Sequence, residues 1–156
     1  MIEMIRIEIP QRETIELKHA VFDINGTLAF DGKPWPEVVS RLKRLASFLS
    51  IHLLTAATHG QVAALERSLG LPLHVIDTGE EKTRYVEELG PANVIAFGNG
   101  VNDAGMLRRA AIGVAVLGPE GVAREALQAA DVLVRNPIDG IDLLFYPKRL
   151  IATLRP

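Results

Sequence analysis

The chain has no cysteine among its 156 residues. Disulfide bonds, thiolate catalysis and cysteine-ligated zinc are therefore excluded. Its apolar runs all fall well short of the ~20 residues that a membrane-spanning helix needs. The first ten residues lack the basic segment and long apolar stretch of a signal peptide. We therefore expect a cytoplasmic protein with no membrane partner.

An excess of charge of one sign is also lacking. There are 17 basic and 19 acidic residues, which gives a formal net charge of -2. Such a chain has no general attraction to nucleic acid, so we expect no nucleic-acid partner. The densest basic cluster, at Arg41, Lys43 and Arg44, is interpreted as the solvated face of a helix.

What the chain does have is enough apolar sequence for one core. Its length and an apolar content of 48% predict a single domain over residues 1–156. Residues 1–17 contain two short alternating runs, which predict an N-terminal β-hairpin extension. From 18 to 156, apolar strand-like runs alternate with helical patterns. We therefore expect an α/β fold, a Rossmann-like three-layer α/β/α domain with a mostly parallel sheet.

The polar residues that follow the expected strands are the candidate functional residues. Ligands of parallel α/β sheets bind outside the carboxyl ends of the strands. Asp23 ends the strand expected at 19–23, and Thr55 ends the one at 51–55. Two glycine-containing loops, 98–100 and 118–120, follow later strands. Neither loop gives the GxGxxG pattern of a dinucleotide-binding module.

Asp23 and Thr55 each have two interpretations. Asp23 is placed to attack an electrophile or bind a cation, beside a turn that Gly26 permits, or it caps that turn. Thr55 can donate to a phosphate oxygen together with the backbone amides after it. Alternatively, Thr55 satisfies the end of its own strand, and Thr58 caps the next helix.

Lys82 and Asp103 are also open to two interpretations. Lys82, near the start of a predicted helix over 82–89, would neutralise charge during phosphoryl transfer, or it is simply solvated. The loop around Asp103 offers oxygen ligands that suit Mg²⁺. Alternatively, Asp103 or Asn102 caps the helix that follows.

In this order, the segments resemble the motifs of the haloacid-dehalogenase-like (HAD) superfamily of phosphohydrolases and phosphotransferases. The first motif, Asp-x-Asp-Gly-Thr, stands here as DINGT. The second, an apolar strand ending in Thr or Ser, stands as IHLLT, and the third is Lys82. The fourth, often Gly-Asp-Gly-x-Asn-Asp, stands as GNGVND. The resemblance spans residues 18–144 and looks closest to the phosphorylation domain of P-type ATPases.

The resemblance implies a set of roles around an aspartyl-phosphate intermediate. Asp23 would be the nucleophile, and Thr55 and Lys82 would assist it. The family pattern implies phosphate contacts from the backbone or side chains of Asp23, Gly26, Thr55, Ala56, Lys82 and Asn102. Mg²⁺ would be bound by Asp23, the backbone carbonyl of Asn25, Asn99 and Asp103.

Two amides depart from the family pattern. Asn25 replaces the acid that would protonate the leaving group and activate water, and an amide cannot exchange that proton. P-type ATPases carry Thr there and still form the phospho-enzyme, so we expect slow turnover. Asn99 replaces a charged ligand, which predicts weaker Mg²⁺ binding. The alternative is a catalytically reduced domain with a phosphate-binding, regulatory or partner-binding role.

The segments between the motifs are too short for a cap domain. Residues 28–50 have room for one flap and one helix, and 59–81 for a helix, a strand and a turn. The resemblance implies that capless relatives act on exposed phosphates or form oligomers in which a neighbour closes the site. We therefore expect a capless protein that forms a homo-oligomer or acts on a small phosphorylated substrate. Asp31 and His59 are other candidate proton carriers. The alternatives are a tight turn at Asp31-Gly32 and a surface position for His59.

Overall fold

The computed structural model describes residues 4–56, 59–76 and 78–156 and has a six-stranded parallel sheet at its centre. The strand order is β10-β9-β8-β3-β6-β7. The predicted mostly parallel sheet is confirmed, and the strands expected at 19–23 and 51–55 are found with ends within one residue of those bounds. The strands are β3 (His19–Asp23), β6 (Ser50–Thr55), β7 (Leu73–Val75), β8 (Val94–Gly98), β9 (Ile112–Val116) and β10 (Val132–Val134).

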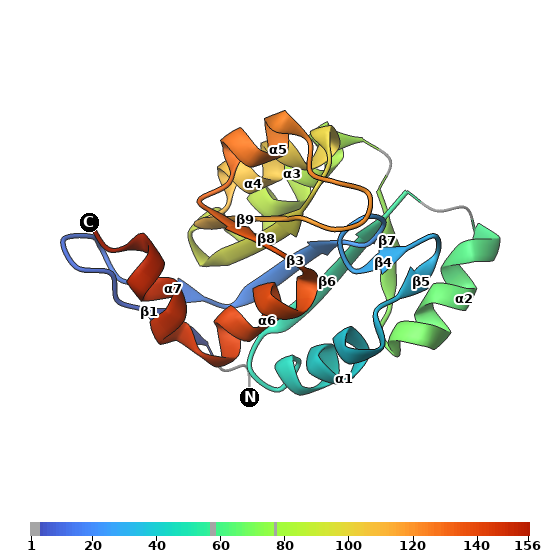
Figure 1. The fold of residues 1–156 in the computed structure, drawn as a ribbon, viewed down its shortest axis with the longest axis horizontal. Helices are drawn as coiled ribbons and strands as arrows, with labels where there is room; N and C mark the ends of the chain where they lie inside the picture. The colour runs from blue at the N-terminus through green and yellow to red at the C-terminus, as the bar shows by residue number, and fades with distance from the viewer. Residues whose placement is uncertain (1–3, 57–58, 77) are drawn as a thin grey trace.

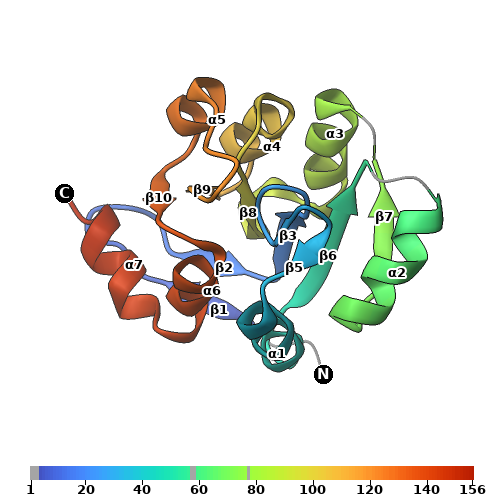
Figure 2. The same ribbon diagram turned by 45° about the vertical axis from the view of Figure 1, so that its right-hand side comes forward.

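Helices cover both faces of this sheet (Figures 1 and 2). One face carries α3 (Gly79–Leu89), α4 (Ala104–Arg109) and α5 (Arg124–Ala129). The other carries α1 (Pro36–Leu45), α2 (His59–Leu69), α6 (Pro137–Phe145) and α7 (Pro147–Leu154). Apolar side chains of the two helix layers form two buried clusters, one on each face of the sheet. The three-layer α/β/α prediction is therefore confirmed.

Local sequence explains where several of these helices begin. Proline occupies the first position of α1, α6 and α7, where its fixed backbone angle suits a helix and its missing N–H costs nothing. At α3, the hydroxyl of Thr78 accepts a hydrogen bond from the backbone N–H of Glu81. This cap fixes the start of the helix that carries Lys82.

Two small hairpins lie outside the central sheet. β1 (Ile5–Ile7) and β2 (Ile15–Leu17) pair in antiparallel fashion and form the predicted N-terminal hairpin. β4 (Ala29–Phe30) and β5 (Lys33–Pro34) form a second hairpin, which we call the flap. Both residues of its turn, Asp31 and Gly32, have positive φ angles, of 52° and 77°. The structure therefore has the tight turn expected at Asp31-Gly32.

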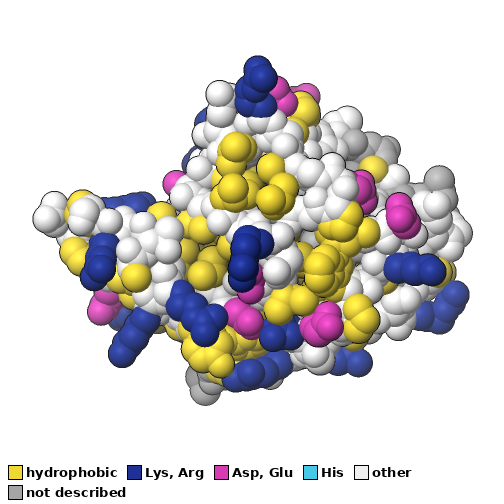
Figure 3. Space-filling model, viewed as in Figure 1, with side chains coloured by type: hydrophobic (Ala, Val, Ile, Leu, Met, Phe, Trp, Pro, Cys, Tyr) yellow, Lys and Arg dark blue, Asp and Glu magenta, His cyan; other side chains and the backbone are white. Residues whose placement is uncertain are grey.

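The described surface mixes charge types. On the face shown in Figure 3, Lys and Arg side chains lie among acidic and apolar ones and form no continuous basic stripe. Within residues 4–56, 59–76 and 78–156, no helix has both the length and the apolar character needed to cross a membrane.

Candidate active site

Strand register brings the polar candidates to one edge of the sheet. β3 is central, and its Asp23 pairs with Leu54 of β6, directly before Thr55. On its other side, Phe22 pairs with Phe97 of β8, directly before Gly98. Asp23, Thr55 and the loop after Gly98 therefore meet at the carboxyl edge of the sheet, as parallel strands require.

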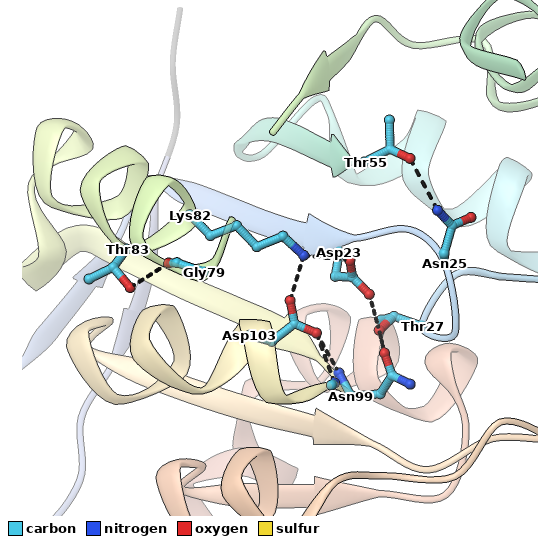
Figure 4. A network of polar contacts seen from close by, with 10 residues as sticks. Asp23, Asn25, Thr27, Thr55, Gly79, Lys82, Thr83, Asn99 and Asp103 are labelled. Carbon is cyan, nitrogen blue, oxygen red and sulfur yellow. Dashed lines mark hydrogen bonds and ion pairs between the residues drawn. The ribbon is translucent and has the colours of Figure 1, made fainter. Parts of the chain in front are cut away.

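Lys82 joins two carboxylates at the centre of this site (Figure 4). Its Nζ lies 2.8 Å from Oδ1 of Asp23 and 2.8 Å from Oδ1 of Asp103. Lys82 is only 1% exposed, and Asp23 and Asp103 are 6% and 0% exposed. The alternative of a solvated lysine is therefore wrong, because this ammonium is buried between two acids.

The charges in this group do not balance, because two carboxylates share one ammonium. Burial and the nearby carboxylate of Asp103 raise the pKa of Asp23 to about 7, against the opposing contacts with Lys82 and Thr27. Burial opposes the charged form of Lys82, but the two carboxylates outweigh it and raise the pKa of Lys82. A further cation beside Asp23 would offset the surplus negative charge.

Asp103 also organises the loop that follows β8. Its Oδ2 accepts hydrogen bonds from the backbone N–H groups of Asn99, at 2.9 Å, and Gly100, at 3.0 Å. The same residue ends the short 3₁₀ helix η2 (Val101–Asp103) and precedes α4. The predicted cap of α4 is not formed, because the side chain of Asp103 makes no capping hydrogen bond to that helix; its carboxylate instead caps η2 and also contacts Lys82.

A close approach of two helices supports the Lys82–Asp103 pair. A β-carbon added to Gly105, in α4, would collide with the hydroxyl of Thr83 in α3. Thr83 follows Lys82, and Gly105 is two residues after Asp103. The lack of a side chain at 105 therefore lets α3 and α4 bring their charged residues together.

Thr27 connects the first and fourth motifs. Its hydroxyl donates to Oδ2 of Asp23 at 3.1 Å and lies 3.2 Å from Oδ1 of Asn99. A β-carbon on Gly26 would come within 2.5 Å of the Asn99 amide, and Gly26 has a φ of 84°. This position therefore needs glycine for both its backbone conformation and its space. The motif pattern alone gives Thr27 no role of its own, although it is the last residue of DINGT.

Asn25 lies at the exposed rim of the site and contacts Thr55. Its Nδ2 donates to Oγ1 of Thr55 at 3.2 Å, and Thr55 itself is fully buried. Ala56 follows at an exposed position. Asn102 is exposed in η2, and its backbone packs against Gly79 at the start of α3. Thr58 lies outside the described residues, as does the side chain of His59.

The donor atoms at this edge fit a small hard cation. Thr27 has one hydroxyl proton between two acceptors, Oδ2 of Asp23 and Oδ1 of Asn99, so one acceptor has capacity for a cation. No cluster of three or more His, Cys, Asp or Glu suited to a metal occurs among the described residues. A set of few carboxylates with amide and carbonyl oxygens is typical of Mg²⁺, which keeps several waters.

Comparison with known sequences bears on the family of the chain. A family model for haloacid dehalogenase-like hydrolase matches residues 83–141, which include the fourth motif. An uncharacterized protein of Methanocaldococcus jannaschii is 38% identical over 78 residues, covering 47% of this chain and 84% of that protein. A probable copper-exporting P-type ATPase of Archaeoglobus fulgidus is 31% identical over 120 residues, covering 76% of this chain and 14% of the ATPase.

Solved structures share the fold. The 3-deoxy-D-manno-octulosonate 8-phosphate phosphatase of Moraxella catarrhalis, in complex with magnesium and phosphate ions, has a TM-score of 0.62 at 16% identity. That alignment covers 89% of this chain and 94% of the phosphatase. A zinc-transporting PIB-type ATPase in its E2.Pi state has a TM-score of 0.59 at 28% identity, covering 75% of this chain and 19% of the transporter.

The all-parallel sheet between two helix layers and the buried Asp–Lys–Asp group define a Rossmann-like α/β domain with a polar site at the carboxyl ends of its strands. With the sequence matches, they give its family. The chain belongs to the haloacid dehalogenase-like superfamily and resembles the phosphorylation domain of P-type ATPases.

Proposed function

We propose that this chain is a Mg²⁺-dependent phosphohydrolase or phosphotransferase in which Asp23 forms an aspartyl-phosphate. The observation that carries the proposal is the contact of Lys82 with both Asp23 and Asp103 at the carboxyl edge of the sheet. We further propose residues 18–156 as the catalytic core, with residues 1–17 as an accessory hairpin.

In the first step, a carboxylate oxygen of Asp23 forms a bond to phosphorus while the bond to the leaving oxygen breaks. Lys82 holds the Asp23 carboxylate in place and offsets negative charge that the incoming phosphate adds. Thr55 and the backbone N–H of Ala56 are assigned to the phosphoryl oxygens. In the second step, water attacks the aspartyl-phosphate and releases inorganic phosphate.

Asn25 limits both steps in this proposal. It cannot give a proton to the departing oxygen or take one from the attacking water, so solvent must do both. Substrates whose leaving groups need no protonation should therefore react fastest.

A divalent ion would bind Asp23, the side-chain oxygen of Asn99 and the backbone carbonyl of Asn25. When bound, Mg²⁺ supplies positive charge that stabilises the phosphoryl oxygens. Asp103 already accepts hydrogen bonds from Lys82 and two backbone N–H groups. Its proposed role is therefore to position the loop that carries Asn99.

The test is incubation with acetyl phosphate or p-nitrophenyl phosphate and Mg²⁺, comparing the natural chain with Asp23→Asn. We expect phosphate labelling and turnover that the variant loses, and trapping by beryllium fluoride at Asp23. Equal rates for the two proteins would refute the enzyme proposal. Phosphate binding without turnover would favour the second candidate, a catalytically reduced domain with a regulatory or partner-binding role, which the amides at 25 and 99 favour.

We propose a small phosphorylated substrate in the cytoplasm, reached without a membrane or nucleic-acid partner. Formation of a homo-oligomer stays a prediction.

A further inference from the structure

The central sheet ends on one side at β10, beyond which the described residues place no further strand. Figure 2 shows β10 at the margin of the sheet, between α5 and α7. A hollow of about 330 Å³ lies beside this strand, and its lining consists of Leu133, Val134, Arg135, Asp139, Leu143 and Arg149. An edge strand of this kind presents backbone N–H and C=O groups that can pair with another strand.

The opposite edge of the sheet has a protection that β10 lacks. Pro72 directly precedes β7, and proline has no N–H to offer to a neighbouring strand. β10 and the two residues that flank it contain no proline, and the middle residue of the strand is Leu133. Leu133 is 48% exposed, whereas Val132 and Val134 are buried. An apolar side chain in the centre of an open strand favours pairing with a partner.

The charges on either side of Leu133 fit a second copy of the same strand. Asp131 and Arg135 are both exposed and lie two residues before and two residues after Leu133. In an antiparallel pair centred on Leu133, residue 131 of each copy faces residue 135 of the other, and Leu133 faces itself. Each carboxylate thus meets a guanidinium on both sides of the centre. A parallel pair in the same register would instead place like charges opposite each other.

The directions of these side chains are compatible with such a pair. Residues two apart along a strand point to the same side. Val132 and Val134 belong to the buried cluster under α1, α6 and α7, so Leu133 points to the side of α5. The backbone N–H of Asp131 bonds to the carbonyl of Gly113 in β9 at 2.8 Å, so Asp131 continues the line of the strand.

Both charged groups have capacity for a partner. Oδ2 of Asp131 accepts a hydrogen bond from the backbone N–H of Gly113, and its Oδ1 can accept another. Arg135 contacts Asp139 at 3.1 Å, but its side chain is 87% exposed, so this ion pair can be exchanged at little cost. Asp139 and Arg149, which line the hollow, are again of opposite sign. The edge therefore carries no net charge that would repel a second copy.

We propose that β10 is the interface of a homodimer, in which two copies pair their β10 strands in antiparallel fashion about a two-fold axis at Leu133. The two sheets then form one continuous sheet, and the partner strand covers the hollow. The two Asp131–Arg135 pairs fix the register. Asp23 ends β3, which is separated from β10 by β9 and β8, so the inference does not depend on the proposed phosphoryl transfer.

The test exchanges charges between two variants. Arg135→Glu places a glutamate opposite Asp131 of the second copy, and Asp131→Lys places a lysine opposite Arg135. By sedimentation equilibrium, each variant alone should dimerise at least about tenfold more weakly than the natural chain. An equimolar mixture has complementary charges at both positions and should regain the dimer. Variants that had merely failed to fold would not be rescued by mixing.

The control is Arg67→Glu, which makes the same charge change at an exposed position of α2 and should keep the natural affinity. Equal weakening in this control would overturn the proposal, because the effect would then come from net charge. A mixture as weak as its components would overturn it too. A natural chain that stays monomeric up to millimolar concentration would do the same, even if β10 then bound an extended segment of another protein.

A second test measures the register. The chain has no cysteine, so Leu133→Cys introduces a single thiol. Antiparallel pairing centred on residue 133 places the thiols of two copies directly opposite each other, within the Cα separation that a disulfide spans. With oxidised glutathione, Leu133→Cys should form a crosslinked dimer at least about tenfold faster than Leu127→Cys, which replaces an exposed leucine of α5. Equal rates in the two variants would overturn the proposed pairing.

Discussion

Two loops at the carboxyl edge of the sheet each carry an asparagine where the family pattern has an aspartate. The two asparagines have different surroundings. In the loop after β3, Asn25 is exposed and makes one side-chain contact, to Thr55. In the loop after β8, Asn99 is half-buried, with its amide between Thr27 and the carbonyl of Gly121. The first amide can thus be exchanged with little structural cost, whereas the second is part of the contact between the loops.

Removing the Lys82 ammonium, which contacts both Asp23 and Asp103, should have the largest effect on stability and on labelling. Lys82→Met leaves two buried carboxylates without their ammonium, so we expect a destabilisation of about 3–5 kcal/mol. We also expect labelling of Asp23 to fall by more than roughly 10³-fold. Denaturant unfolding and acetyl phosphate labelling measure the two effects. Arg84→Met on the same helix removes an exposed cation and is the control; a matching loss there would contradict the assignment.

Restoring the acid in the first loop should have the next largest effect. Asn25→Asp supplies a proton carrier next to the site and should raise turnover of phosphate monoesters with basic leaving groups, such as glycerol 2-phosphate, by about 10²-fold. Steady-state kinetics measure it, with Asn25→Thr as a control that adds no proton carrier of useful pKa. Unchanged or lower activity in Asn25→Asp would count against slow turnover being due to Asn25.

The corresponding change in the second loop should have a smaller and different effect. Asn99→Asp adds a charged oxygen ligand, so Mg²⁺ should bind about tenfold more tightly. The change also removes the donor to Gly121 and costs about 1 kcal/mol without metal. Calorimetric Mg²⁺ titration and thermal unfolding measure both. Gln128→Glu, at an exposed position in α5, is the control. Equal tightening in both variants would indicate a general charge effect.

A histidine chain away from both loops gives a predicted effect on stability alone, with none on activity. Nε2 of His52 lies 3.1 Å from Nδ1 of His19, and Nδ1 of His52 lies 2.8 Å from the hydroxyl of Tyr85. Burial, followed by the neighbouring His19 and His74, lowers the pKa of His52 to about 4. The unfolded chain therefore binds a proton more readily, so stability is complete above pH 6.5 and falls between pH 6.5 and 4.

For this half-buried ring we expect a loss of roughly 1–2 kcal/mol over that range, after allowing for solvent screening. Unfolding curves of the natural chain and His52→Gln at pH 7.5 and 4.5 measure it. The variant should lose less stability on acidification. An identical pH dependence would show that acid acts elsewhere, including at the two loops.

Much of the fold and the order of the site could be predicted from the sequence. The apolar runs give the strands, and parallel strands must end at one edge, which brings Asp23 and Thr55 together. The contact of Asn99 with Gly26, and that of Asn25 with Thr55, depend on side-chain directions in loops, which periodicity does not encode. The His19–His52–Tyr85 chain depends on strand register, which also has no local signal.

The close approach of α3 and α4 at Gly105 and Thr83 has a consequence for protein engineering. Gly105 keeps the distance between the opposite charges of Lys82 and Asp103 short, although it contacts neither charged group. Gly105→Ala would act as a spacer between the two helices and lengthen the Lys82–Asp103 contact without altering any charged group. The site could thus be adjusted by distance alone, from a position that no catalytic motif includes.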